Sequence, residues 1–375
     1  MLIFLTKIMQ KDTLFTLIKI FGVLGALYMF LVGIKGMSSA IKHMGADVAE
    51  NIFTATSDPF IALFIGVLAT VLFQSSSTTT SLIVGMVSSG ALGLSGAVPM
   101  IMGANIGTTV TNTIVSVGHI NRTNEFRRAF AASTVHDFFN ILSVLILFPL
   151  EMTFHWIQKS AEWVASLVFG RIHNVDVLQA KSPIKVAVKS GAKFVEQFTF
   201  NNDIIYLVLS VLITFFMLYS LVKLLRSLVL EKIEVFFDQY IFKTVFRAIG
   251  FGIILTIMVQ SSSITTSLVV PLAGAGVLSL RQIFPFTLGA NIGTTVTALL
   301  AALTGTVSAL IAAISHLFFN IFGILIVYGI PQLRAIPLKL AEMIAEYSLK
   351  NKFIPLGYLL IVFVGIPLTI ILLGR

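Results

Sequence analysis

Apolar residues occur in long runs along this chain, separated by short polar and basic segments. A membrane-spanning helix needs about 20 predominantly apolar residues. We interpret the first run as a retained helix and not as a cleaved signal peptide, because it continues to about Gly33 without a clear small-residue cleavage site. The pattern therefore indicates an all-α polytopic membrane protein. The predicted spans cover residues 17–40, 94–118, 128–150, 203–224, 280–303, 306–330 and 353–373.

Two further apolar runs, about 57–91 and 243–277, are interrupted near the middle by the string Gln-Ser-Ser-Ser. A run of this length with a polar centre is typical of a re-entrant helical hairpin, which enters and leaves the membrane on one side. Non-helical backbone at that depth is tolerated only where protein or a water-filled cavity covers it. We therefore expect each interruption to lie inside the protein.

The two interruptions belong to an internal duplication. Residues 74–113 and 260–299 are identical at 22 of 40 positions, and both contain QSSS followed by GANIGTTVT. The first copy is expected to cross the membrane three times before the second begins, and an odd number of crossings inverts the second copy relative to the first. A duplicated membrane chain with a polar interruption in each half is typical of a secondary transporter that binds its substrate between two inverted-topology repeats.

This duplication divides the chain into four segments. Residues 1–150 form the first repeat, 151–202 a linker, 203–330 the second repeat, and 331–375 an amphipathic segment with the final transmembrane helix. The linker is predicted to form interfacial amphipathic helices. It carries two tryptophans and four lysines at intervals of four, namely Trp156, Trp163, Lys181, Lys185, Lys189 and Lys193.

Composition supports a membrane protein and excludes several other classes. The 375 residues are 57% hydrophobic and 11% charged, whereas soluble domains carry about 25% charged residues. The net charge of +9 comes from basic residues between the spans, so no nucleic-acid partner is needed. The absence of cysteine excludes disulfides and thiolate chemistry. A cytoplasmic N-terminus places most basic loops, including Arg127, Arg226 and Arg334, on the cytoplasmic side of a cell (inner) membrane.

Charged residues are absent around both QSSS strings. Residues 61–118, 248–280 and 282–333 contain no Asp, Glu, Lys or Arg. The second helix of a hairpin begins with free N–H groups and a positive dipole, so an anion can bind there without an arginine. Hydroxyl and amide oxygens also suit Na⁺, and a cation compensates the charge of a multivalent anion at low dielectric. The pattern therefore predicts symport of an anion with Na⁺.

One acid in the repeats enters a span. Asp137 follows His136, whereas the second repeat has Leu317 after His316. Ionisable residues inside spans carry a functional hypothesis by default, so we expect Asp137 to take part in sodium coupling. The alternative is an ion pair with Arg127 or Arg128. The two histidines are expected to be structural hydrogen-bond partners and not proton relays.

These strings resemble the type II sodium/phosphate cotransporter family, in a bacterial form. The resemblance rests on the paired QSSS and GANIGTTVT strings and on FRRAF (126–130) followed by VHDFFN (135–140). It implies Na⁺-driven import of inorganic phosphate, with Na⁺ as coupling ion and no other cofactor, and electrogenic transport because an acid is present in VHD. A homodimer is a further possibility. Ala290 departs from the family, since animal members often have serine there.

The resemblance also implies roles for individual residues. Phosphate would be bound by Gln74, Ser75, Ser76 and Ser77 together with Gln260, Ser261, Ser262 and Ser263. Sodium would be bound by Asn291, Thr294 and Thr297 with Asn140 nearby, and we add the first-copy counterparts Asn105 and Thr108 and the acid Asp137.

Three other functions remain open from the residues alone. A sodium-coupled carboxylate carrier could use the same hairpin serines, although no arginine lies near them to bind a carboxylate in bidentate fashion. A phosphate exporter could use the same scaffold. An intramembrane serine hydrolase is disfavoured, because no GxSxG-like motif singles out a nucleophile.

Overall fold

Helices form all the regular structure in the part of the chain that the computed structural model describes, residues 2–169, 183–200, 202–233 and 241–374. Six helical segments are long and apolar enough to cross a membrane. The prediction of an all-α polytopic membrane protein is confirmed. The six segments are Phe15–His43, Thr123–Phe154, Asp203–Val229, Leu280–Ala302, Val307–Tyr328 and Ile354–Leu373.

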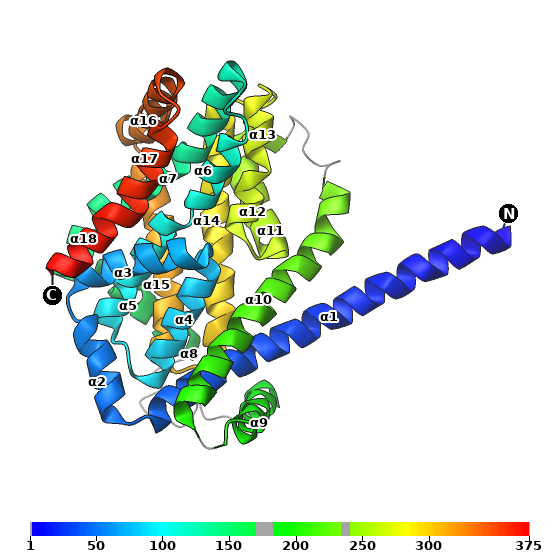
Figure 1. Cartoon of the computed structure of the whole chain (residues 1–375), viewed down its shortest axis with the longest axis vertical. Coiled ribbons are helices and arrows are strands. Elements are labelled where there is room, and N and C mark those ends of the chain that lie inside the picture. The colour runs from blue at the N-terminus through cyan, green and yellow to red at the C-terminus, as the bar shows by residue number, and fades with distance from the viewer. Residues whose placement is uncertain (1, 170–182, 201, 234–240, 375) are drawn as a thin grey trace.

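Figure 1 shows the order of the helices along the chain. The first half contains α1 (Leu2–His43), α2 (Ala46–Ala55), α3 (Pro59–Phe73), α4 (Ser76–Ser89), α5 (Leu94–Gly107), α6 (Val110–Val117), α7 (Thr123–Phe154), α8 (Trp156–Phe169) and α9 (Pro183–Gln197). The second half contains α10 (Asp203–Ile233), η3 (Ile241–Lys243), α11 (Val245–Val259), α12 (Ser262–Ser267), α13 (Val269–Gly274), α14 (Leu280–Ala302), α15 (Val307–Gly323), η4 (Ile324–Tyr328), α16 (Pro331–Lys350), α17 (Ile354–Leu360), η5 (Ile361–Gly365) and α18 (Ile366–Leu373).

Both predicted interruptions of the apolar runs are present, at the ends of α3 and α11. The second helix of the first hairpin is continuous, whereas that of the second is divided into α12 and α13 at Leu268. Pro271 accounts for this division, because proline has no N–H to donate to the carbonyl of Ser267 four residues earlier. Gly85 stands at the corresponding position of α4.

The predicted continuous span 94–118 is wrong, because the structure has α5 and α6 separated at Thr108 and Thr109. The hydroxyls of both threonines donate to carbonyls of the preceding turn, those of Ala104 and Ile106. Such bonding disfavours a regular helix but does not forbid it. The same string continues without a break in α14, where it is followed by Ala-Leu-Leu-Ala-Ala and not by Asn-Thr-Ile-Val-Ser, and alanine and leucine favour a helix more strongly.

Close glycine crossings join each hairpin to the helix that carries GANIGTTVT. A Cβ built on Gly103 of α5 would lie 1.9 Å from the carbonyl oxygen of Leu63 in α3. A Cβ on Gly289 of α14 would lie 2.1 Å from the carbonyl oxygen of Ile249 in α11. Only glycine permits backbones to approach this closely. The two copies therefore pack their helices in the same way.

Helices of each half also pack against helices of the other half. In the first half, α7 packs against α13 and α16, and in the second half α15 packs against α4 and α8. In the view of Figure 1, α4 and α8 lie toward the bottom of the molecule, whereas α13 and α16 lie toward the top. The second helices of the two hairpins therefore extend in opposite directions from the middle of the protein.

The remaining helices surround this centre. Helix α1 packs against α10 and α9, and its N-terminal half extends away from the rest of the chain in Figure 1. The linker contains α8, with exposed Trp156 and Trp163, and α9, with buried Val188 and Ala192. Part of the linker, including Lys181, lies outside the described residues.

Candidate functional site

Each hairpin turns at a glutamine in the left-handed conformation. The φ angle is 52° at Gln74 and 55° at Gln260. This conformation is unfavourable for a residue with a side chain and persists only where its surroundings fix it. The next residue, Ser75 or Ser261, is extended and accepts a hydrogen bond from the backbone N–H three residues later. The turn therefore ends one helix and caps the next.

The glutamine side chains join each hairpin tip to its GANIGTTVT string. Gln74 Oε1 accepts a hydrogen bond from Thr111 at 3.2 Å, and Gln260 Oε1 accepts one from Thr297 at 2.9 Å. Each amide nitrogen also donates to a carbonyl of its own helix, at 2.6 Å and 2.7 Å. Both glutamines therefore hold the tips in place, and each keeps one amide hydrogen for a ligand.

Three of the eight predicted phosphate ligands have unused hydroxyls. Ser76, Ser77 and Ser262 are buried, and their hydroxyls make no hydrogen bond within the described part of the chain. Ser263 donates to the carbonyl of Thr108 at 3.3 Å, across the two halves. The N–H groups of the first residues of a helix also lack intrahelical acceptors. The tips thus offer several donors and no fixed charge.

Asparagine and histidine side chains connect the halves next to the tips. His136 Nε2 donates to Asn291 Oδ1 at 2.6 Å, and Asn291 Nδ2 donates to Asn140 Oδ1 at 2.8 Å. Asn140 Nδ2 in turn donates to the backbone carbonyl of Asn105 at 2.8 Å. The structure therefore brings three predicted sodium ligands, Asn105, Asn140 and Asn291, into one buried network.

The corresponding bonds of the other copy are longer. His316 Nε2 lies 3.4 Å from Asn105 Oδ1, and Asn320 Nδ2 lies 3.5 Å from the carbonyl of Asn291. Asn320 Oδ1 has no partner among the described residues. The histidines thus hold asparagines of the opposite repeat, consistent with a structural role.

The threonines predicted to bind sodium are buried in the same region. The hydroxyls of Thr108 and Thr294 donate to the carbonyls of Ala104 and Ala290, both at 3.0 Å. Their oxygens retain lone pairs that can face a cation. Within the described residues no group of three or more carboxylates and histidines forms a metal site. Any cation here would be bound mainly by neutral oxygens.

Asp137 is buried without a basic partner. Its Oδ2 accepts a hydrogen bond from the Tyr358 hydroxyl at 2.9 Å, and its Oδ1 has no partner among the described residues. The alternative of an ion pair with Arg127 or Arg128 is wrong, because Arg127 pairs with Glu346 and Arg128 donates to carbonyls of α13. A buried carboxylate oxygen without a partner is a natural ligand for a cation.

Sequence reasoning missed a second cluster between the halves. Asn112 of α6 exchanges hydrogen bonds with Thr266 of α12 at 2.8 Å and 3.0 Å, and its Oδ1 also accepts one from Ser267 at 3.2 Å. The second copy has Ala298 at the position of Asn112. Asn112 directly follows the shared GANIGTTVT string, and this difference at the end of the string is the signal that could have identified the cluster.

Comparison with known proteins gives consistent matches. The chain matches a family model described as Na+/Pi-cotransporter over residues 29–170 and 199–334. Its alignment with sodium-dependent phosphate transport protein 2B of Homo sapiens extends over 445 residues at 34% identity. The alignment covers 92% of this chain and 64% of that protein. Its alignment with sodium-dependent phosphate transport protein 2A of Rattus norvegicus extends over 436 residues at 35% identity. The alignment covers 96% of this chain and 68% of that protein. The chain thus spans less than two thirds of the length of the 2B relative. No solved structure matches it.

Proposed function

The chain belongs to the Na+/Pi-cotransporter family, and we propose that it is a symporter that imports inorganic phosphate down the Na⁺ gradient. The observation that carries this proposal is the pair of hairpin tips, where the buried serines Ser76, Ser77 and Ser262 have hydroxyls without partners. A tetrahedral oxyanion needs several donors, and hydroxyls can rotate to supply them.

The phosphate site in this proposal is neutral. Ser75 and Ser261 cap the helices, whereas Ser76, Ser77, Ser262 and Ser263 face the anion together with the first N–H groups of each second helix. Helix N-termini stabilise anions through their dipoles. Arg128 cannot serve a carboxylate substrate here, because its guanidinium is bound to the carbonyl oxygens of Ala273 and Gly274. This use of the arginine favours phosphate over a carboxylate.

Sodium is proposed to bind at two sites. The first is the network around Asn140 of α7 and Asn291 of α14. Thr294 and Thr297 follow Asn291 on α14. The second is the free Oδ1 of Asp137, where the Thr113 hydroxyl is also buried without a partner. The hydroxyls of Thr109 and Thr113 lie beside this carboxylate. A carboxylate in this position adds one sodium charge to the transported complex, which makes transport electrogenic.

An inverted arrangement of the two repeats is proposed for the transport cycle. The opposite directions of α4 and α13 in Figure 1 support it. Ser95 and Arg281 are exposed at equivalent positions just after the hairpins, and the chain has no cysteine of its own. We expect an impermeant maleimide to label Ser95→Cys from outside and Arg281→Cys only from inside. Labelling of both from one side would mean that the repeats are parallel.

The proposed setting is a cell (inner) membrane with the N-terminus in the cytoplasm. The basic residues between the spans support this orientation. A second copy of the chain is the proposed partner, because Phe21 and Leu24 of α1 are 70% and 57% exposed. Cross-linking through Phe21→Cys is expected in membranes if the dimer forms along α1, and its absence at several positions of α1 would exclude that interface.

Transport itself is tested in proteoliposomes. Purified protein should take up labelled phosphate when Na⁺ is higher outside, and replacement of Na⁺ by K⁺ should abolish the uptake. Equal phosphate flux with and without Na⁺ would refute coupling. Succinate in excess should not compete with phosphate, and strong competition would indicate a carboxylate carrier.

A further inference from the structure

Four lysines gather where α9 crosses α1, away from the hairpin tips. Lys35 and Lys42 come from α1, and Lys185 and Lys189 come from α9. Lys35 is partly buried, and the other three ammonium groups are close enough to repel it. A partly buried charge surrounded by charges of the same sign is unfavourable unless an anion compensates it. The cluster therefore indicates an anionic ligand.

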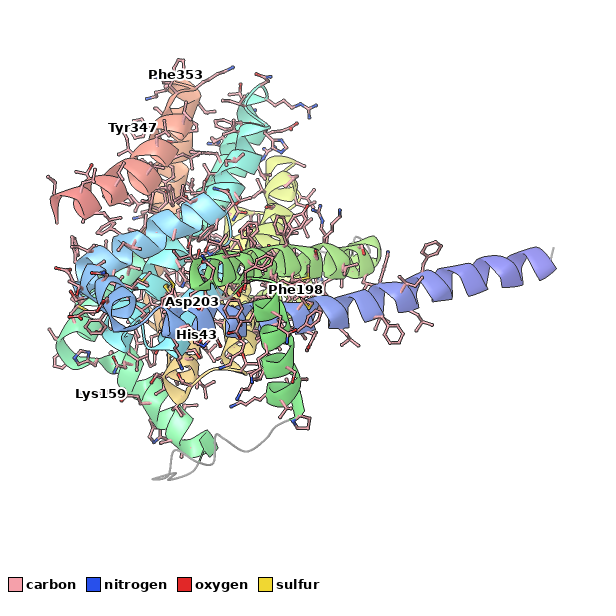
Figure 2. The ribbon with its side chains drawn as sticks, turned by 60° about the horizontal axis from the view of Figure 1, so that its bottom comes forward. His43, Lys159, Phe198, Asp203, Tyr347 and Phe353 are labelled. Atoms are coloured by element: carbon pink, nitrogen blue, oxygen red, sulfur yellow. The ribbon has the colours of Figure 1, made fainter. Side chains whose placement is uncertain are left out.

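Two acidic residues described near this cluster pair with His43 and not with the lysines. Glu196 of α9 and Asp203 of α10 lie 3.6 Å and 3.5 Å from His43 Nδ1. Figure 2 shows His43 beside Asp203 at the junction of α1 and α10. Within the described residues, no carboxylate forms an ion pair with Lys35.

An apolar groove lies next to the lysines, between α1, α9 and α10. Its volume is about 630 Å³. The Tyr28 hydroxyl donates to the carbonyl of Ala187 at 3.1 Å. This bond fixes the orientation of the tyrosine ring, which lines the groove. Phe194 and Phe198 are about 60% exposed beside the groove. Its lining comprises Tyr28, Met29, Gly191, Phe194, Leu209 and Ile213, among others.

Helix α1 connects the groove to the lysine cluster. Lys35 follows Tyr28 by seven residues, which places both on one face of α1, about 10 Å apart along the helix. A ligand with an anionic group and a hydrocarbon chain could therefore occupy both parts at once.

We propose that this groove binds an anionic phospholipid, with its headgroup phosphate at Lys35, Lys42 and Lys189 and one acyl chain between Tyr28, Phe194 and Ile213. Basic pockets between transmembrane helices recognise anionic headgroups through the same chemistry. The lipid would join α9 to the α1–α10 pair. This site shares no residue with the proposed phosphate site and does not depend on the transport function.

Lipid titration of the purified full-length protein in detergent tests the proposal. Dioleoylphosphatidylglycerol should raise the melting temperature with saturation, whereas dioleoylphosphatidylcholine should not. The double variant Lys35→Gln/Lys189→Gln should need about thirtyfold more phosphatidylglycerol, because each lysine is expected to contribute about fivefold near an anionic headgroup. Lys35→Arg/Lys189→Arg should restore the wild-type concentration.

Lys193→Gln is the matched control, since it removes a charge from α9 outside the cluster and should change the titration little. The soluble headgroup glycerophosphoglycerol should not stabilise the protein, because it lacks an acyl chain. Equal stabilisation by phosphatidylcholine, or unchanged titration of the double variant, would overturn the proposal. If the double variant is unstable, native mass spectrometry of the exposed-site variant Lys189→Gln measures bound phosphatidylglycerol directly, and unreduced occupancy would also overturn it.

Discussion

Asn105 and Asn291 occupy equivalent positions in the duplicated string, but they meet different partners. Asn291 makes two short hydrogen bonds to side chains of the first repeat, those of His136 and Asn140. Asn105 uses its amide nitrogen for the carbonyl of Ile101 in its own helix, and its oxygen lies 3.4 Å from His316. One half of the network is therefore tightly bonded, and the other has spare hydrogen-bonding capacity.

The two repeats also differ at other positions near the site. Asp137 has Leu317 as its counterpart, and Asn112 has Ala298. The hairpin tips themselves are alike, with left-handed glutamines bonded to equivalent threonines. The comparison teaches that the duplication preserves the groups proposed to bind phosphate, whereas the residues beside them have diverged. We therefore expect substrate binding to need both halves and sodium coupling to depend mainly on one arrangement.

Removal of serine hydroxyls from both tips should have the largest effect. A hydrogen bond to a charged group contributes about 1.5–3 kcal/mol, so Ser76→Ala/Ser262→Ala should weaken phosphate binding by more than a hundredfold. Initial rates of phosphate uptake at fixed Na⁺ measure this loss. Ser89→Ala is the control at the far end of the first hairpin. Near-normal uptake by the double variant would refute a site shared by the halves.

Substitution of the two asparagines should give unequal losses. Asn291→Ala leaves a buried histidine donor and the Asn140 oxygen unpaired, at a cost of about 1–3 kcal/mol each. Asn105→Ala removes the long contact to His316 and a bond to a carbonyl of its own helix, and it should cost about 1 kcal/mol. Thermal unfolding and the Na⁺ concentration for half-maximal uptake should both change more for Asn291→Ala. Equal effects would mean that the two halves of the network are equivalent in solution.

Loss of the Asp137 carboxylate should separate uptake from current. Divalent phosphate with two Na⁺ carries no net charge, and a third Na⁺ carries one, which is driven by about 2.3 kcal/mol per 100 mV. Asp137→Gly should therefore keep phosphate uptake, lose phosphate-induced current and lower the Hill coefficient for Na⁺.

Tyr358→Phe is the matched control for that variant, since it retains the carboxylate and should retain the current. Preserved current and Na⁺ dependence in Asp137→Gly would assign Asp137 a structural role alone.

The helices and the candidate site could be predicted from the sequence to different extents. Apolar runs interrupted by QSSS gave the positions of both hairpins, because polar residues in the middle of such a run have few other uses. The break at Thr108 could not be predicted from the string itself, since the identical string in α14 forms a continuous helix. The residues after the string differ, with Asn-Thr-Ile-Val-Ser in the first copy and Ala-Leu-Leu-Ala-Ala in the second, and the second sequence favours a helix more strongly.

Side-chain partners distant in sequence were also beyond prediction. Tyr358 lies 221 residues after Asp137 and in the final span, where an apolar pattern gives no sign of a polar contact. The glutamines were expected to bind phosphate, but their side-chain oxygens already accept hydrogen bonds from Thr111 and Thr297. A sequence string indicates which chemical groups are available, and only packing decides which of them are already bonded.

Asn112 offers the smallest and most direct test of how the two halves differ. Asn112→Ala gives the first copy the residue found at Ala298 in the second. Thr266 would keep its bond to the carbonyl of Ser262, and Ser267 its bond to that of Ser263, so no hydroxyl is left unpaired. Only the links between α6 and α12 are lost, at about 1 kcal/mol, which is expected to lower the melting temperature by roughly 2 °C while uptake persists. An unchanged melting temperature would show that this cluster does not hold the second hairpin, and a complete loss of uptake would place Asn112 in the substrate site.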